Sequence, residues 1–508
     1  MVMSPLFKNV IYQVTGQGIV LLLGFIGVKF IFSRLGPDAF GIIYFNLVLT
    51  GVLTTALELG VLATTVREVS SHHRSEPLYV EQLIRTASLF YWGLGVVLFV
   101  AVFLAAPLLV DRWINIKSID HATATTMLRY LSVTTLIMLP RALCSSLFQG
   151  RQRMELNNSI DVASSAVQQA GTIAILAGGG GAFAVVQWIA ASAVLSTLTY
   201  TVIAGRLFGW RALIPTYFDA VVKRNVRFTS HMGALSVLNM TLSQIDKVVV
   251  SKLQTIANVG YYSFTATVMV RISFAATAIS QAALPSFASL HRQGETDRLL
   301  VQYRKLQDLM AYGMGLVFAA AAFGAVPLYS YLFTRQVAFE LLLPTAILCL
   351  GFFMNSSMIV PYTFSVAVGR PDIASRASVL ALFIVIPTTI TLVYLFGLTG
   401  AATSWVVYQV FLYVYLVPRI CRRCMHIPTG SWFLHILKVL VLAAATYCSA
   451  WMGIAVPHSY SVFALAIAYV LASLVFVVGA YLLIGRDLRE TISTLPYRLR
   501  VRGAAGVH

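Results

Sequence analysis

Apolar residues run through this chain in helix-length stretches, separated by short segments rich in Gly, Pro, Lys and Arg. Such stretches are long enough to cross a hydrocarbon layer about 30 Å thick as helices. They lack the short alternating segments of a transmembrane barrel. The pattern therefore predicts an all-α polytopic membrane protein. About fourteen transmembrane helices are expected, near residues 9–33, 40–64, 83–108, 120–148, 158–177, 182–205, 226–252, 260–288, 308–333, 338–365, 374–396, 400–418, 432–455 and 461–484.

The chain also repeats itself at an offset of 218 or 219 residues. Four pairs of landmarks share this spacing: Lys29 with Lys247, Gly41 with Gly260, Gly150 with Gly369, and Gly181 with Gly400. Six expected helices fall in each repeat, which is an even number. Both halves therefore start on the same side of the membrane, as a parallel duplication does.

The repeat predicts how the chain is divided. We expect an N-terminal six-helix half (1–206), a cytoplasmic linker (207–225) and a C-terminal six-helix half (226–420). Residues 421–508 are expected to form two extra helices and a basic cytoplasmic tail. The two halves are predicted to be pseudo-symmetric bundles around a central cavity.

Composition and charge agree with this topology. Of the 508 residues, 58% are hydrophobic and 11% are charged, and the mean hydropathy is +0.82, whereas soluble domains have about 25% charged residues. Lys and Arg number 36, of which 25 lie in the even-numbered loops and termini and five in the odd-numbered loops. This bias predicts that both termini are cytoplasmic. The net charge of +18 is largely this signal and requires no nucleic-acid partner.

Nine charged residues lie inside the expected helices and more than two residues from either end. A charge at the bilayer centre costs about 2.5–3.5 kcal/mol on insertion scales, so these side chains are expected to face protein or a wet cavity. The basic members are Lys29, Arg129, Arg141, Lys247, Arg271 and Lys438, and the acidic members are Glu58, Asp161 and Asp246.

A polar stripe on residues 226–252 predicts a helix that lines a hydrated cavity. Ser236, Asn239, Ser243 and Lys247 are spaced i, i+3, i+7 and i+11, which places them on one helical face. The alternative is a seam between helices that is held by small polar residues. A seam rarely needs a lysine, so we favour the cavity.

The intramembrane cations predict an anionic substrate. Lys29 and Lys247 occupy equivalent places in the two halves and would lie on opposing cavity walls, although lysines near helix ends can also reach the interface. Arg271 lies too deep for that, about 16 Å into its helix, and its planar fork suits phosphate. Its alternative role is an ion pair with Glu58 or Asp246.

Three further residues have two open interpretations. Arg141 is a candidate substrate ligand or a structural residue. Glu58 and Asp246 are candidates for coupling to an ion gradient, or for permanent partners of a cavity cation. Asp161 lies near a helix start, where a carboxylate suits the helix dipole.

Motifs for catalysis or cofactors are weak in this sequence. It contains no GxxxxGK[ST] phosphate loop and no HExxH motif. Cys421 and Cys424, with His426 and His435, have the wrong spacing for known zinc fingers. We expect no enzyme activity, no metal and no cofactor.

Several short segments resemble a known family. They are Arg34-Leu-Gly-Pro-Asp-Ala-Phe-Gly41, Leu57-Glu-Leu-Gly60 followed by Arg67-Glu68, Gln149-Gly150-Arg151, Ile245-Asp246-Lys247, Val259-Gly260-Tyr261-Tyr262 and Leu284-Pro285-Ser286. With the duplicated six-plus-six arrangement, they resemble the polysaccharide branch of the multidrug/oligosaccharidyl-lipid/polysaccharide exporter superfamily, the Wzx-like O-antigen and exopolysaccharide flippases. Members often carry Asp where Glu58 stands, a departure that keeps the charge.

The resemblance implies a function. Such proteins move an undecaprenyl-diphosphate-linked oligosaccharide across the bacterial inner membrane by alternating access. The residues that we expect to contact such a substrate, from their positions and chemistry, are Lys29, Lys247, Arg271, Arg141, Asn239 and Ser243. Coupling to a proton or sodium gradient, through Glu58 or Asp246, is a hypothesis.

Other functions remain open from the sequence. An ion-coupled multidrug exporter has the same fold, but cationic drugs favour acidic cavities and the balance here is six basic to three acidic residues. A lipid II flippase shares the lipid carrier. A membrane glycan polymerase or ligase usually needs a large external loop, and the loops expected here are short.

Overall fold

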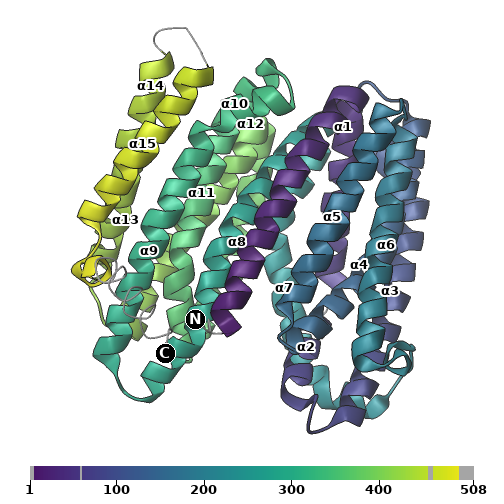
Figure 1. Cartoon of the computed structure of the whole chain (residues 1–508), viewed down its shortest axis with the longest axis horizontal. Helices are drawn as coiled ribbons and strands as arrows, with labels where there is room; N and C mark the ends of the chain where they lie inside the picture. The colour runs from purple at the N-terminus through teal and green to yellow at the C-terminus, as the bar shows by residue number, and fades with distance from the viewer. Residues whose placement is uncertain (1–4, 58–59, 456–461, 491–508) are drawn as a thin grey trace, which may run out of the picture. The chain divides into compact units, whose positions relative to one another are not determined.

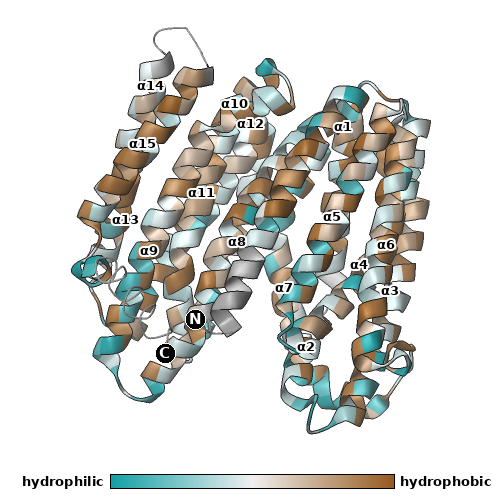
Figure 2. Ribbon diagram, in the orientation of Figure 1, coloured by the Kyte–Doolittle hydropathy of each residue, from teal (hydrophilic) through white to brown (hydrophobic). Residues whose placement is uncertain are grey.

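The helical fold class is confirmed by the structure. The computed structural model describes residues 5–57, 60–455 and 462–490, and all long elements in these ranges are helices (Figure 1). Hydrophobic residues follow the bodies of the helices, and hydrophilic residues gather at their ends and in the turns (Figure 2). This distribution is what a hydrocarbon layer demands, because a helix satisfies its own backbone hydrogen bonds.

The described chain packs as two compact units. Unit 1 comprises Met1–Arg271, Tyr331–Thr334 and Ser378–Ser404, and unit 2 comprises Ile272–Ser330, Arg335–Ala377 and Trp405–His508. The elements of unit 1 are α1 (Pro5–Leu57), α2 (Val61–His72), α3 (Pro77–Arg112), α4 (His121–Gly150), α5 (Met154–Ala177), α6 (Ala182–Phe208), the 3-10 turn η1 (Trp210–Leu213), α7 (Asp219–Leu253), and parts of α8 (Ile256–Arg292) and α12 (Asp372–Ile420). Those of unit 2 are the rest of α8 and α12, α9 (Thr296–Phe323), α10 (Ala325–Leu332, whose last two residues belong to unit 1), α11 (Arg335–Ala367), η2 (Cys421–Met425), α13 (Thr429–Ala443), η3 (Ala444–Cys448), α14 (Ser449–Ala455) and α15 (Val462–Leu483).

Ten of the described helices are long and apolar enough to cross a membrane. Two of them, α1 and α12, each join two predicted spans across a glycine with left-handed backbone, Gly36 at φ 81° and Gly397 at φ 57°. Counting each as two spans, and adding the more polar α5 (24 residues) and α7 (35 residues), gives the fourteen spans that were predicted, within the described residues.

One predicted boundary differs from the structure. The second span was expected to run from 40 to 64, but α1 ends at Leu57 and a separate helix, α2, begins at Val61. Gly60 has φ 75°, a conformation that ends a helix and that few other residues adopt. Glu58, a candidate site residue, falls at this break and lies outside the described residues.

The core of unit 1 lies among the first six helices. Helix α3 packs on α4, α4 on α6, and α1 on α5. Phe148 of α4 and Tyr200 of α6 are fully buried and stack with ring centres 5.7 Å apart. The four-part division of the chain at 206, 225 and 420 remains a prediction, since the compact units group the chain by packing rather than by repeat.

Helices α1 and α8 cross at two glycines that the sequence repeat relates. A Cβ atom on Gly41 would lie 2.1 Å from the carbonyl oxygen of Ile256, and one on Gly260 would lie 2.9 Å from the Cα atom of Gly41. Both distances are far too short for a side chain. Small residues let membrane helices approach until their backbones touch, which increases the van der Waals packing that holds the helices together.

A cluster of aromatic rings surrounds this crossing. Phe333 lies with its ring centre 4.9 Å from Phe32, 5.1 Å from Tyr261 and 5.4 Å from Phe40. Phe264 joins them at 5.7 Å. Edge-to-face pairs of this kind stabilise by about 0.5–1.5 kcal/mol beyond the burial of their area. The cluster thereby fixes the short segment Tyr331–Thr334 against α1 and α8.

Replacing Gly41 by Ala is expected to destabilise the protein by about 1–3 kcal/mol, because the added methyl group meets a backbone carbonyl that cannot move aside. The matched control is Gly51→Ala in the same helix, where nothing lies within 4 Å of the added Cβ. That change is expected to be neutral, or stabilising by up to about 1 kcal/mol. Thermal unfolding in detergent measures both; equal midpoints for the two variants would contradict the close crossing.

Candidate substrate site

Lys29 lies in the first segment of α1 and is partly buried. Its Nζ atom donates a hydrogen bond to the backbone carbonyl of Tyr331 and lies 4.9 Å from the centre of the Tyr331 ring. Within the part of the chain that the structure describes, no carboxylate oxygen lies within 4.0 Å of this ammonium. Among the described residues, the ammonium therefore contacts neutral groups and no carboxylate.

Lys247, the repeat partner of Lys29, does have a carboxylate beside it. Its Nζ atom donates to the carbonyl of Ser243 at 3.0 Å and lies 3.5 Å from Oδ1 of Asp246. The other oxygen of Asp246 accepts a hydrogen bond from the hydroxyl of Tyr262 at 2.7 Å. Both charged side chains are largely buried, with 12% of Lys247 and 9% of Asp246 exposed. The two lysines thus share a place in the repeat but differ in their electrostatic surroundings.

The polar stripe on α7 is partly open. Asn239 and Ser243 are exposed and Ser236 is partly buried, whereas Asp246 beside them is buried. The Ser243 hydroxyl donates only to the carbonyl of Met240 in its own helix, at 3.2 Å. A seam between helices would cover these side chains. Their exposure supports the cavity-lining interpretation, which stays a prediction.

Arg271 has a neutral partner. Its Nη1 atom donates to the side-chain oxygen of Gln17 on α1 at 2.7 Å. Among the described residues no carboxylate lies within 4.0 Å of it, although Asp161 and Tyr44 are within electrostatic range. Asp246, one expected partner, is instead held by Tyr262 and Lys247. This arrangement leaves most of the donors on the guanidinium fork available to a ligand.

Arg141 is the cation that the structure pairs most directly. Its Nη2 atom lies 2.7 Å from Oδ1 of Asp161, and the same oxygen accepts from the hydroxyl of Tyr200 at 2.9 Å. The guanidinium also lies 5.3 Å from the centre of the Tyr200 ring. This triad joins α4, α5 and α6. It fits the structural alternative for Arg141, while its assignment as a substrate ligand stays a prediction.

Arg129 has the poorest environment of the charged residues in α4. Its Nε atom is buried without a hydrogen-bond partner among the described residues, and its guanidinium lies 5.1 Å from the centre of the Phe103 ring.

The last of the intramembrane cations, Lys438 of α13, is exposed. No group of three or more His, Cys, Asp or Glu side chains that could hold a metal ion occurs among the described residues.

The sequence did not identify the neutral partners. Gln17, Tyr262 and Tyr331 each contact a candidate charge, yet their positions in the sequence are 254, 16 and 302 residues away from their partners. Gln17 is a polar residue within an apolar stretch, and this is the feature of the sequence that could have indicated a polar contact there. Tyr262 belongs to the segment Val259-Gly260-Tyr261-Tyr262 that carries the family resemblance, but nothing in that segment indicates its contact with Asp246, and no local pattern distinguishes Tyr331.

Comparison with known proteins identifies the family. Residues 6–291, more than half of the chain, match the family model described as "Polysaccharide biosynthesis protein". The chain belongs to this family. All eight candidate site residues lie within the matched segment: Lys29, Glu58, Arg141, Asn239, Ser243, Asp246, Lys247 and Arg271. The predicted resemblance to the polysaccharide branch of the exporter superfamily is thereby confirmed.

Individual relatives agree with this assignment. The chain is 23% identical over 442 residues to a Shigella flexneri protein named "Putative O-antigen transporter", covering 82% of this chain and 98% of that one. The fold is similar to that of the lipid II flippase MurJ in an inward closed conformation, with a TM-score of 0.68 at 14% identity, covering 97% of this chain and 100% of that one. It is also similar to an inward-facing multidrug transporter of the MATE family, with a TM-score of 0.65 at 13% identity, covering 81% and 98%.

A double-mutant cycle on Arg141→Met and Asp161→Asn is expected to give a coupling energy of about 1–2 kcal/mol for unfolding. The value lies below that of a fully buried pair because 29% of Arg141 and 34% of Asp161 are exposed. The cycle is measured by chemical unfolding in detergent. Additive effects of the two substitutions would show that the pair does not hold α4 against α5.

Proposed function

We propose that this protein is a flippase that moves an undecaprenyl-diphosphate-linked oligosaccharide from the inner to the outer leaflet of the bacterial inner membrane. The observation that carries the proposal is Arg271, an intramembrane guanidinium with a glutamine as its hydrogen-bond partner. A cation without a carboxylate within ion-pair distance favours an anionic ligand, and the fork of arginine suits phosphate oxygens. Membership of the polysaccharide biosynthesis family supports the same conclusion.

The substrate and the site have matching chemistry. A diphosphate needs cations, which Lys29 and Arg271 offer. A glycan needs hydrogen-bonding groups in a hydrated space, which the exposed Asn239 and Ser243 offer. The lipid tail needs no polar contact and can remain in the bilayer.

Lys29 and Arg271 are expected to act one after the other. Arg271 is bound to Gln17, which lies twelve positions before Lys29 on the same straight segment of α1. Twelve residues correspond to about 18 Å along a helix, which is far longer than a diphosphate group. One diphosphate therefore contacts the two cations at different stages of its passage, or Lys29 contacts an acidic sugar while Arg271 holds the phosphates.

Transport is proposed to proceed by alternating access, with both termini in the cytoplasm and with the two halves of the repeat rocking about the substrate. A monovalent cation, either a proton or sodium, is proposed to drive it through Glu58 or Asp246. Asp246 suits this role because its carboxylate is buried and in contact with both Lys247 and Tyr262. Protonation of such a group changes the charge of a buried network.

Two other functions share this fold. A multidrug exporter for organic cations needs acidic ligands. Of the three intramembrane acids predicted from the sequence, Asp161 and Asp246 are each engaged by a basic side chain. A lipid II flippase carries the same lipid diphosphate with a different glycan. The likeness to MurJ over 97% of the chain makes this the second candidate, and the glycan on the transported lipid separates the two.

Arg271→Ala is expected to slow the flipping of a fluorescent undecaprenyl-diphosphate oligosaccharide about 10- to 100-fold in proteoliposomes. The loss of one hydrogen bond to a charged group, worth about 1.5–3 kcal/mol, sets this range. Arg271→Lys keeps the charge and removes the planar fork of donors. Its flipping rate is expected to lie between those of the wild type and Arg271→Ala.

The matched control for this assay is Lys252→Ala, which removes a cation at the last turn of α7 whose Nζ atom lies 5.4 Å from the Trp113 ring. It is expected to flip at the wild-type rate. Undiminished flipping by Arg271→Ala would remove Arg271 from the site. Efflux of organic cations by the wild type, without flipping, would overturn the proposed function.

An imposed proton or sodium gradient is expected to accelerate flipping in the same vesicles. Asp246→Asn is expected to retain slow flipping without this acceleration, because the neutral side chain cannot take up or release a cation. The assay compares rates with and without an ionophore that collapses each gradient. A wild-type rate that is indifferent to both gradients would contradict ion coupling.

A further inference from the structure

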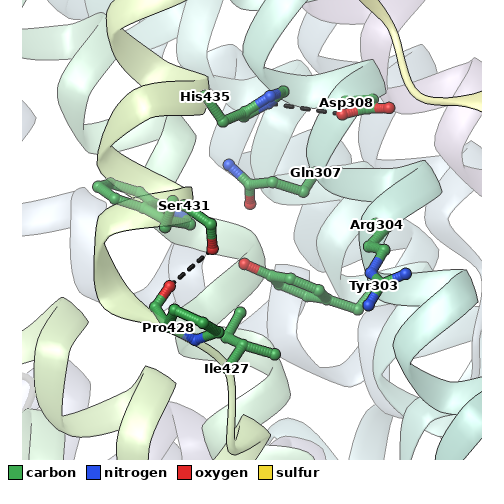
Figure 3. Close-up of a pocket in the computed structure, with 9 residues that line it drawn as sticks. Tyr303, Arg304, Gln307, Asp308, Ile427, Pro428, Ser431 and His435 are labelled. Carbon is green, nitrogen blue, oxygen red and sulfur yellow. Dashed lines mark hydrogen bonds and ion pairs between the residues drawn. The ribbon is translucent and has the colours of Figure 1, made fainter.

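Unit 2 contains a cavity of about 240 Å³ that the proposed transport function does not use (Figure 3). It lies between α9 and the start of α13, and the residues that matter for its chemistry are Tyr303, Arg304, Gln307, Asp308, Trp432 and His435. At about 30 Å³ for each water-sized group, it has room for about eight of them. The space suits a small polar molecule or the headgroup of a lipid.

Four buried polar atoms of the lining lack a hydrogen-bond partner of ordinary geometry among the described residues. They are the hydroxyl of Tyr303, the side-chain oxygen of Gln307, the indole nitrogen of Trp432 and Nε2 of His435. Tyr303, Gln307 and Trp432 are only 3%, 4% and 3% exposed, respectively. Figure 3 shows Tyr303 and Gln307 extending into the same space. Buried polar groups almost always have partners, so this set indicates an occupant that both accepts and donates hydrogen bonds.

Asp308 supplies a negative charge at one end of the cavity. Its Oδ2 atom accepts a hydrogen bond from the backbone N–H of Gly485 at 2.8 Å. Its Oδ1 atom lies 3.5 Å from Nε2 of His435, which is longer than a good hydrogen bond. Asp487 is within electrostatic range and adds to the negative potential at Asp308, while Lys438 opposes it near His435. One carboxylate oxygen thus remains available to a cation.

Arg304 supplies a positive charge. It is exposed, lies one helical turn before Asp308 on α9, and belongs to the lining of the cavity. The indole N–H of Trp432, which also lies within range of the Tyr303 hydroxyl, is a second donor in the same lining. Acceptors for a cation and donors for an anion are therefore both present in one small space.

We propose that this cavity binds a phospholipid headgroup that carries a primary ammonium next to a phosphate. The three N–H groups of the ammonium would donate to Asp308 Oδ1, the Gln307 oxygen and the Tyr303 hydroxyl. The phosphate would accept from Arg304 and from the indole of Trp432. A phosphoethanolamine group has about as many non-hydrogen atoms as the cavity has water-sized places.

The position of the cavity along the helices suits a lipid. Tyr303 lies seven residues into α9, or about 10 Å from its start, and Trp432 lies in the first turn of α13. Both helices are candidate membrane spans. The cavity is therefore near the end of each span, at the depth where a headgroup meets the hydrocarbon. With the predicted orientation, that lipid belongs to the cytoplasmic leaflet.

Binding of three phospholipids to the purified full-length protein in detergent tests the proposal. Native mass spectrometry with phosphatidylethanolamine, phosphatidylcholine and phosphatidylglycerol of equal chain length measures each affinity. Phosphatidylethanolamine is expected to bind one site about tenfold more tightly than phosphatidylcholine, because a quaternary ammonium has no N–H to donate. Asp308→Asn and Tyr303→Phe are each expected to remove most of this preference.

The matched control is Asp297→Asn, which removes an exposed carboxylate in the first turn of α9 and outside the cavity. It is expected to bind as the wild type does. Equal affinity for phosphatidylethanolamine and phosphatidylcholine would overturn the proposal, as would tighter binding of phosphatidylglycerol. The absence of saturable lipid binding would also overturn it and would indicate that water fills the cavity. If Asp308→Asn fails to fold, Tyr303→Phe decides, since it removes only a hydroxyl group.

Discussion

The close crossing of α1 and α8 at Gly41 and Gly260 determines how the candidate site of unit 1 is arranged. Because neither residue has a side chain, the two backbones touch, and the register of one helix against the other is fixed at that point. The aromatic ring of Phe333 packs beside this crossing, against Phe32 and Phe40. From there the first segment of α1 runs along α8 in the opposite direction, with Phe25 opposite Phe264 and Gln17 opposite Arg271. The hydrogen bond between Gln17 and Arg271 thus follows from the contact of Gly41 with Gly260, which lie 24 residues (41 − 17) and 11 residues (271 − 260) away in their respective helices.

The partners of the intramembrane charges distinguish their roles. A partly buried cation that already has a carboxylate, such as Arg141 with Asp161, is neutralised, which fits a structural role. Lys29 and Arg271, whose hydrogen-bond partners among the described residues are a carbonyl and an amide oxygen, keep an uncompensated charge and are the proposed ligands of the anion. Lys247 is neutralised to an intermediate degree, because Asp246, the carboxylate beside it, also accepts a hydrogen bond from Tyr262. The cations therefore differ in how far a carboxylate neutralises them. Such differences suit a transporter, since a site that binds an anion too tightly cannot release it.

Much of the fold was predictable from the sequence for a physical reason. A bilayer requires helix-length apolar stretches and tolerates few charges, so hydropathy alone predicts the spans. The repeat identified Gly41 and Gly260 as a pair before their contact was known. Boundaries were less certain: the ninth span was expected to begin at 308, whereas α9 begins at Thr296, because Arg298, Arg304 and Lys305 lower the hydropathy of its first turns.

The partners within the sites were not predictable in the same way. Gln17 with Arg271 and Asp246 with Tyr262 are tertiary contacts, and no periodicity in a single sequence encodes them. Asp308 lies at the predicted start of a span, where a carboxylate is ordinary at an interface, so its position carries no signal. His435 lies near two cysteines in the sequence, but its contact is with Asp308. The cavity between α9 and α13 depends on the part of α9 that holds Tyr303 and Gln307, which precedes the predicted start of the span at 308.

The central claim is that intramembrane cations bind a lipid-linked diphosphate. Its most direct test is the equilibrium binding of undecaprenyl diphosphate to the purified protein, compared with undecaprenyl monophosphate and with an organic cation. The account predicts that the wild type prefers the diphosphate about tenfold over the monophosphate. It also predicts that this preference disappears when Lys29 and Arg271 are both replaced by Gln. Equal binding of the two lipids by the wild type, or a preference for the organic cation, would contradict the account.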